Sequence, residues 1–185
     1  MAARDVHDIV AHSLAVVIVQ ADAGRYAAGR EREVLATVAQ TARAALADVY
    51  HLIDLLRDEP ERPDALHRLV GTVRTAGLDV RLDARPSVFD GVPAPVRTAA
   101  LRVVRESLTN VLKHAGPDGA AEVTLRRTAA GVSVRVADRG ATARPGTGHG
   151  ITGMRERVTE LGGTFEAGPQ PGGFLVEATV PAAAR

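Results

Sequence analysis

The distribution of proline divides this chain of 185 residues into two parts that can fold differently. Residues 1 to 58 contain no proline, and all ten prolines come later. Because proline interrupts helices and central strands, the first part is free to form long helices. The first two prolines lie in the charged segment RDEPERPD, which is typical of a linker. We therefore predict two domains, residues 1–60 and residues 61–185.

The first part predicts a helical hairpin. Within residues 34–56, small or apolar residues recur at alternating spacings of three and four, as in a heptad seam. An earlier helix carries a shorter seam and includes the β-branched segment AVVIVQ, whose flanks are polar at helical spacing. Two amphipathic helices cannot bury both apolar faces alone, so we predict a homodimer that forms a four-helix bundle. The seam positions are Val10, Leu14, Val17 and Ala21, then Leu35, Val38, Ala42, Ala45, Val49, Leu52 and Leu56.

Composition narrows the class of protein. Hydrophobic residues make up 45%, enough for a core, but aromatic residues are only 3%, so the core must be aliphatic. A net charge of +1 gives no electrostatic argument for nucleic acid as a partner. The absence of cysteine excludes disulfides and thiolate metal sites, and no apolar run approaches the ~20 residues of a membrane span. Since there is no signal-peptide pattern either, we expect a cytoplasmic location.

The second part predicts an α+β domain, because helical and alternating patterns interleave. In AEVTLRRTAAGVSVRVAD, apolar and polar residues alternate on both sides of a glycine-containing turn, which indicates a β-hairpin. We expect helices at residues 64–76, 94–116 and 151–163, a strand at 78–83, and hairpins at 121–138 and 163–181.

A first polar motif lies on the predicted long helix, in RESLTNVLKHAG. Glu106 and Asn110 are four residues apart and therefore share one face of the helix. Lys113 lies beside this stripe, and His114 lies one turn beyond Asn110. An asparagine on an amphipathic helix is commonly just solvated, so this motif alone assigns no function.

Two glycine-containing motifs follow. In VADRGA, Asp138 ends a predicted strand and Gly140 turns the chain. In GTGHGITGMRER, Gly146, Gly148 and Gly150 precede a helix, where glycine lets backbone N–H groups approach phosphates and the helix N-terminus favours anions. Each motif alone fits an ordinary turn or connection. Their order after the helical motif is the specific signal.

In this order the motifs resemble the ATP-binding domain of the superfamily of gyrase, Hsp90, histidine kinases and MutL. The stretch GHGITGMRERVTELGG is especially similar to histidine kinases that pair with NarL-type response regulators. RDVHDIVAHSL resembles the phosphoacceptor helix of that subfamily, and the helical hairpin resembles its dimerisation domain, of the HisKA_3 type. The resemblance spans the whole chain. It implies a two-layer α+β sandwich of the GHKL ATPase type, the Bergerat fold, for the second domain.

The resemblance implies a site for ATP and Mg²⁺. Asn110 would ligate the Mg²⁺ that bridges the ATP phosphates, with Glu106 as a further metal candidate. Lys113 and His114 would lie near the phosphates. Asp138 would accept a hydrogen bond from the adenine amino group.

The same resemblance implies further residues of this site. Gly140 would make room for the base. Gly148 and Gly150 would line the phosphate side, at the end of a lid formed by residues 139–149. Thr179 is a weaker candidate for a position near the adenine.

The sequence departs from the family pattern in the first glycine box. The family usually shows Asp-x-Gly-x-Gly, whereas DRGAT places Thr142 where the second glycine stands. The lid is also short and contains Pro145. We still expect this domain to bind a nucleotide. The affinity for ATP and the rate of turnover do not follow from the family pattern, because the sequence departs from it here.

Two histidines flank one carboxylate near the N-terminus, in ARDVHDIVAHSL. A nucleophilic histidine must be neutral, and a carboxylate that accepts the N–H of one ring nitrogen fixes the tautomer and leaves the other nitrogen to attack. His7 and Asp8 supply these groups, although sequence neighbours on a helix do not normally face each other. His12 shares a helix face with Asp8, and the resemblance implies that it positions water for dephosphorylation of the regulator.

The sequence therefore points to the core of a sensor histidine kinase. It would autophosphorylate His7 from Mg·ATP and pass the phosphoryl group to an aspartate of a NarL-type response regulator, with phosphatase chemistry through His12. No sensor segment is recognisable, so membrane attachment would run only through a region that this sequence lacks.

Alternatives remain open at this point. His7 and His12 would count as ordinary exposed histidines if they stood alone, and a zinc pair is disfavoured because they are five residues apart rather than four. The altered glycine box suits a non-catalytic dimeric docking scaffold with a vestigial nucleotide fold. A serine kinase or ATPase of the same superfamily would normally lack the upstream His-Asp helix.

Overall fold

A computed structural model describes residues 16–19, 21, 33–39, 41–42, 45, 64–114, 119–139 and 149–182. The chain divides into two compact units, Met1–Asp58 and Glu59–Arg185. Several predicted features lie outside the described residues. They are His7, Asp8, His12, Gly140, Thr142, Pro145, Gly146, Gly148, most of the predicted lid at 139–149, and the seam positions Val10, Leu14, Val49, Leu52 and Leu56.

In the first unit, residues 16–19 and 33–39 are helical. The helix at 16–19 confirms the prediction of helix for a β-branched segment that has local strand propensity. Leu35, a seam position, is 67% exposed in the single chain, and Ile18 is 59% exposed. Exposed apolar side chains of this kind suit a helical surface that a second copy covers, and the four-helix bundle stays a prediction.

We expect Leu35→Asp to dissociate the homodimer, because the bundle would bury this charge without a partner. A buried unpaired charge typically costs about 3–5 kcal/mol. Ala36→Asp places the same charge one position off the seam and should leave the dimer intact. Size-exclusion chromatography with light scattering measures both variants. A wild-type monomer, or a dimer that tolerates Leu35→Asp, would contradict the predicted seam.

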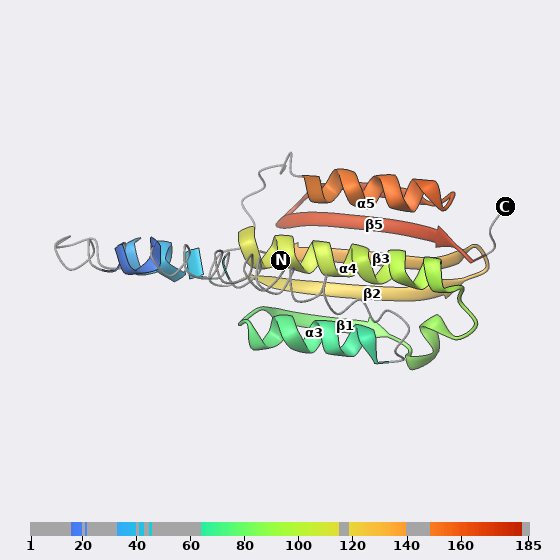
Figure 1. Cartoon of the computed structure of the whole chain (residues 1–185), viewed down its shortest axis with the longest axis horizontal. Coiled ribbons are helices and arrows are strands. Elements are labelled where there is room, and N and C mark those ends of the chain that lie inside the picture. Colours follow the sequence, from blue (N-terminus) through green and yellow to red (C-terminus); the bar gives the residue numbers. More distant parts are fainter. Residues whose placement is uncertain are drawn as a thin grey trace, which may run out of the picture. The chain divides into compact units, whose positions relative to one another are not determined.

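The second unit is an α+β domain (Figure 1). The predicted helices, strand and hairpins are confirmed with small shifts at their ends, whereas the short 3₁₀ helix η1 was not predicted from the sequence. The elements in chain order are α3 (Ala65–Thr75), β1 (Asp79–Ala84), η1 (Pro86–Phe89), α4 (Ala94–His114), β2 (Ala120–Thr128), β3 (Gly131–Arg139), α5 (His149–Glu160), β4 (Thr164–Gln170) and β5 (Gly173–Pro181).

The five strands form one mixed sheet in the order β1-β2-β3-β5-β4. Only β1 and β2 pair in parallel, and the other neighbours are antiparallel. Because β3 and β5 run in opposite directions, the end of β3 meets the beginning of β5, and Ala137 pairs with Leu175. This register places Asp138, the next residue of β3, beside the turn that joins β4 to β5.

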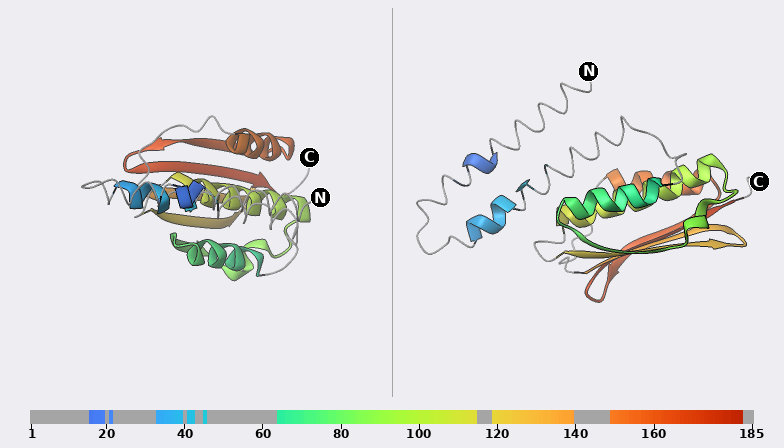
Figure 2. Two further views of the ribbon diagram at one scale, coloured as in Figure 1. Left: turned by 60° about the vertical axis from the view of Figure 1, so that its left-hand side comes forward. Right: turned by 90° about the horizontal axis from the view of Figure 1, so that it is seen from below.

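The α-helices that the structure describes in this unit, α3, α4 and α5, cover the same face of the sheet (Figure 2). The central helix α4 packs on β2, β3 and β5 and contacts α3 and α5 on its two sides. Along β3, Val134 and Val136 face the helices and are at most 2% exposed, and Val104 and Leu108 of α4 are fully buried. The core is thus aliphatic, as the composition requires, and the predicted two-layer α+β sandwich is confirmed.

The opposite face of the sheet is polar, and no helix among the described residues covers it. Alternate residues of β3 point to this side, so Arg135 forms an ion pair with Glu177 of β5 at 3.3 Å. Arg126 of β2 pairs with Asp83 of β1 in the same way. Among the described residues, no helix combines the length and the apolar character that crossing a bilayer requires.

Candidate functional site

Asp138 is a buried carboxyl at the end of β3. Its residue surface is 6% exposed, and it is one of the few buried polar or charged residues of the described part of the chain. Its Oδ1 accepts a hydrogen bond from the backbone N–H of Phe174, at 2.7 Å. The contact joins two residues that are 36 positions apart, and it exists because the start of β5 lies beside the end of β3.

Gly173 makes this close approach feasible. A Cβ at position 173 would overlap with the main-chain oxygen and with Oδ1 of Asp138. Only glycine therefore lets the start of β5 come close enough for the Phe174 N–H to reach the carboxyl. Sequence reasoning assigned Gly173 and Phe174 to a hairpin and missed this role. A glycine at the start of a strand, where another backbone approaches closely, was the available signal.

The surroundings of Asp138 act on its ionisation in opposite directions. Burial raises the pKa of the Asp138 carboxyl, because the charged form loses its hydration. The hydrogen bond from the Phe174 N–H and the nearby His114 lower that pKa in part. The net effect is a raised pKa of Asp138, so the folded state is less stable when this carboxyl is charged than when it is protonated. His114, in the last turn of α4, is one of the groups whose charge acts on Asp138.

A second group of predicted site residues lies where α4 meets the start of α5. A Cβ on Gly150 would lie 3.4 Å from Oε2 of Glu106 and 4.0 Å from the side-chain nitrogen of Asn110. The N-terminus of α5 therefore contacts the polar stripe of α4. Glu106 and Asn110 are both half-buried, so they are held by packing but not sealed from a ligand.

This second group suits a phosphate with a hard cation. Lys113 is half-buried and His114 exposed in the last turn of α4, and α5 begins next to Asn110. A helix N-terminus and a nearby ammonium both favour anions. The oxygen donors of Glu106 and Asn110 are of the type that Mg²⁺ prefers. The described residues contain no cluster of three or more His, Cys, Asp or Glu side chains that could hold a metal.

Thr179 is not brought to Asp138. It pairs with Ser133 in the middle of β3, five residues before Asp138, which corresponds to about 17 Å along a strand. Its neighbours Ala178 and Val180 are buried toward the helices, so Thr179 faces the polar side of the sheet. The structure therefore separates Thr179 from the other described site residues.

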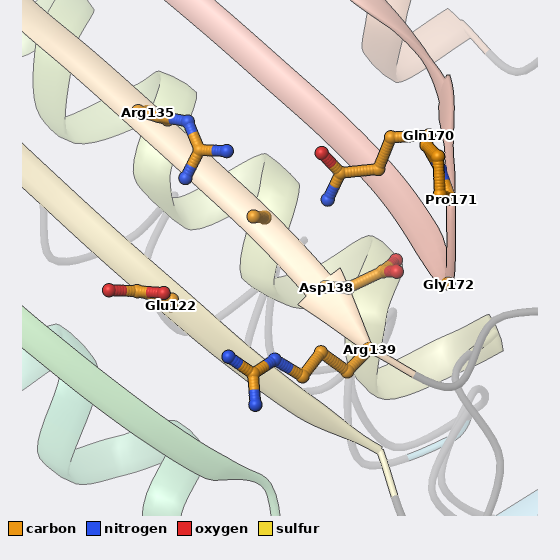
Figure 3. A pocket seen from close by; sticks show the side chains of 8 residues that line it. Glu122, Arg135, Asp138, Arg139, Gln170, Pro171 and Gly172 are labelled. Atoms are coloured by element: carbon orange, nitrogen blue, oxygen red, sulfur yellow. The ribbon is translucent and has the colours of Figure 1, made fainter.

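A pocket of about 310 Å³ lies on the polar side of the sheet, next to Asp138 (Figure 3). In Figure 3 the carboxyl of Asp138 points toward the β4–β5 turn, while Arg135 and Glu122 extend over the strands. The helices lie behind the sheet in this view, so the pocket and the Asn110 stripe occupy opposite sides of the sheet. The residues that line it are Glu122, Arg135, Ala137, Asp138, Arg139, Gln170, Pro171 and Gly172.

We expect Asp138→Asn to fold as well as the wild type, or better, at neutral pH. The raised pKa means that folding favours the protonated carboxyl, so this contribution to stability is present at low pH and is lost as the pH rises through the folded-state pKa. The asparagine amide does not ionise, so the variant does not lose this stability as the pH rises. Its side-chain oxygen can still accept the hydrogen bond from the Phe174 N–H.

Thermal unfolding at neutral and mildly acidic pH measures this effect. The advantage of Asp138→Asn over the wild type should shrink as the pH falls. Asp79→Asn removes the same charge from an exposed position of β1 and controls for the loss of charge alone. A large destabilisation by Asp138→Asn at neutral pH would show that the charged carboxyl stabilises the fold.

The chain matches two family models that together span most of its length. Residues 2–62 match the family described as histidine kinase. Residues 96–184 match the family described as histidine kinase-, DNA gyrase B-, and HSP90-like ATPase. The first range contains the His-Asp motif, and the second contains nearly all of α4 and every element after it.

Curated relatives align with nearly the whole chain. The sensor histidine kinase YxjM of Bacillus subtilis is 32% identical over 189 residues, which cover 97% of this chain and 46% of YxjM. The signal transduction histidine-protein kinase/phosphatase UhpB of Salmonella typhimurium is 30% identical over 179 residues, which cover 88% of this chain and 35% of UhpB. The chain thus spans less than half the length of these relatives.

Solved structures share the fold. The blue-light activated histidine kinase EL346 of Erythrobacter litoralis superposes with a TM-score of 0.52 and 18% identity, over 98% of this chain and 60% of that chain. At this level of identity the likeness concerns the fold alone.

Proposed function

This chain belongs to the histidine kinases, and we propose that its second unit binds Mg·ATP and that the γ-phosphoryl group passes to His7 and then to an aspartate of a response regulator. The observation that carries the proposal is the approach of Gly150 to Glu106 and Asn110. It joins an anion-favouring helix start to two oxygen donors. Asp138, the buried carboxyl at the end of β3, is the group of the same unit that suits a base.

The base end of the proposed site is Asp138. Its Oδ1 is engaged by the Phe174 N–H, which leaves Oδ2 to accept a hydrogen bond from the adenine amino group. Burial strengthens such a contact, because water competes less for the carboxyl. Gly140 would provide room for the base, and it lies outside the described residues.

The phosphate end is formed by α4 and the start of α5. Asn110 would hold Mg²⁺ through its amide oxygen, and Glu106 is the further candidate ligand. When bound, Mg²⁺ neutralises the charge on the ATP phosphates. Lys113 and the N-terminal backbone of α5 at Gly150 would orient the phosphates, since both attract anions. Positioning and charge neutralisation supply most of the catalysis in phosphoryl transfer.

The phosphoacceptor is assigned from the sequence motif. A neutral imidazole at His7 would attack the γ-phosphorus, and Asp8 would accept the other ring N–H and raise the basicity of the nucleophile. His12 would position water for dephosphorylation of the regulator. The relative UhpB is named a kinase/phosphatase, which supports both activities for this chain. We also propose a homodimer and a NarL-type regulator as the partners.

We expect Asn110→Ala to weaken Mg·ATP binding by about 10- to 100-fold, because one hydrogen bond or contact to a charged group is worth about 1.5–3 kcal/mol. Arg102→Ala lies on the same stripe of α4 two turns earlier and should bind as the wild type does. Isothermal titration calorimetry with and without Mg²⁺ measures this. Without Mg²⁺, the difference between Asn110→Ala and the wild type should shrink. Equal Mg·ATP affinity of the two proteins would contradict the assignment of the phosphate end.

We expect the residues of the His-Asp motif to separate by function. His7→Gln should abolish acid-labile label from γ-labelled ATP, because the nucleophile is lost. Asp8→Ala should slow labelling by about 10²–10⁴-fold, the usual effect of losing a positioned base, with unchanged ATP affinity. His12→Ala should keep labelling and slow only the dephosphorylation of the regulator.

Single-turnover labelling, with decay of the phosphorylated regulator followed in parallel, measures all three variants. Acid treatment of the label distinguishes phosphohistidine, which is labile, from phosphoserine, which is stable. Stable label would favour a serine kinase. If His12→Ala loses the label and His7→Gln keeps it, the second histidine is the phosphoacceptor.

A further inference from the structure

The two oxygens of the Asp138 carboxyl have different surroundings. Oδ1 is bound by the Phe174 N–H at 2.7 Å. The last paired residues of β3 and β5 are Ala137 and Leu175, so the Phe174 N–H lies just beyond the backbone hydrogen bonds between these strands. It donates to the side chain of Asp138 and not to a backbone carbonyl. Resting on the proposed function, we propose that the Phe174 N–H is a positioning group that turns Oδ2 toward the base and makes the site select 6-amino purines over 6-oxo purines.

Gly173 holds this donor in place. A Cβ at position 173 would collide with the main-chain oxygen and Oδ1 of Asp138, so the close packing exists only with glycine. The donor is part of the main chain at the start of β5, whose pairing with β3 and β4 fixes its direction. The orientation of the carboxyl is therefore set by the sheet and does not depend on a flexible side chain.

The fixed orientation has a chemical consequence for the bound base. A charged carboxylate only accepts hydrogen bonds, so Oδ2 pairs with the 6-amino group of adenine and opposes the oxygen of a 6-oxo purine. A site built around one hydrogen-bonding pattern rejects the wrong partner strongly, because buried polar groups are then left unpaired. The Phe174 N–H also acts against the effect of burial on the pKa of Asp138, which favours the charged, acceptor-only form.

Asp138→Asn tests the orientation directly. The amide oxygen can still accept the Phe174 N–H, which forces the NH₂ group toward the base. The probes are ADP and inosine 5′-diphosphate, whose bases carry an amino and an oxo group at position 6. Calorimetry should show that the wild type prefers ADP by about 10- to 100-fold. Asp138→Asn should bind inosine 5′-diphosphate at least as tightly as ADP.

A second pair of variants isolates the backbone donor. Phe174→Pro removes the N–H, whereas Phe174→Ala keeps it and removes only the side chain. Added to Asp138→Asn, Phe174→Pro frees the amide to turn its oxygen toward the base and should restore a preference for ADP. Phe174→Ala added to the same variant should not restore it.

The outcomes separate this inference from the proposed function. If the wild type binds neither nucleotide, the proposed function fails and the inference falls with it. If the wild type prefers ADP and Asp138→Asn still prefers ADP, or loses both nucleotides equally, the Phe174 N–H does not set the orientation and the inference alone is overturned. If Phe174→Pro prevents folding, the result for Asp138→Asn decides the question by itself.

Discussion

The packing of α4 across the sheet is the interaction on which both the core and the site depend. Val104 and Leu108 are fully buried, and burying such side chains contributes about 1.5–3 kcal/mol each. The stripe of Glu106 and Asn110 lies on the same helix and reaches the start of α5 at Gly150. Because one rigid helix carries both the buried apolar residues and the polar stripe, the contacts that form the core also fix the position and rotation of the proposed phosphate end.

The base end depends on a different kind of constraint, a carboxyl that is buried at a cost. Burial raises the pKa of Asp138, while the Phe174 N–H and His114 offset part of that effect. Groups with perturbed ionisation of this kind gather at functional sites, where stability is given up for binding. The two ends of the proposed site therefore differ in how function relates to stability. The packing of α4 would serve both, whereas a charged Asp138 would serve binding at a cost in stability.

The elements of this unit that could be predicted from the sequence are those with a periodic pattern of apolar and polar residues. The alternating valines of β3 and the stripe of α4 each follow one period, and the glycine run marked the start of α5. The contact of Phe174 with Asp138 could not be predicted in this way, because it joins residues 36 apart and uses a main-chain donor that no side-chain pattern reveals. Thr179 was expected near the base by resemblance alone. In the structure Thr179 lies between the buried Ala178 and Val180, and the period-two alternation of a strand turns it to the polar face of the sheet.

The donor to Asp138 is a main-chain N–H, a group that every amino acid except proline carries. Position 174 can therefore exchange its side chain over evolutionary time without losing the hydrogen bond. Position 173 has no such freedom, because any Cβ collides with Asp138. Among relatives that share this geometry, divergence should thus accumulate at position 174 and spare the glycine before it. Relatives would then keep the group that orients the carboxyl by keeping the same backbone conformation. A comparison of side chains alone would not reveal this group.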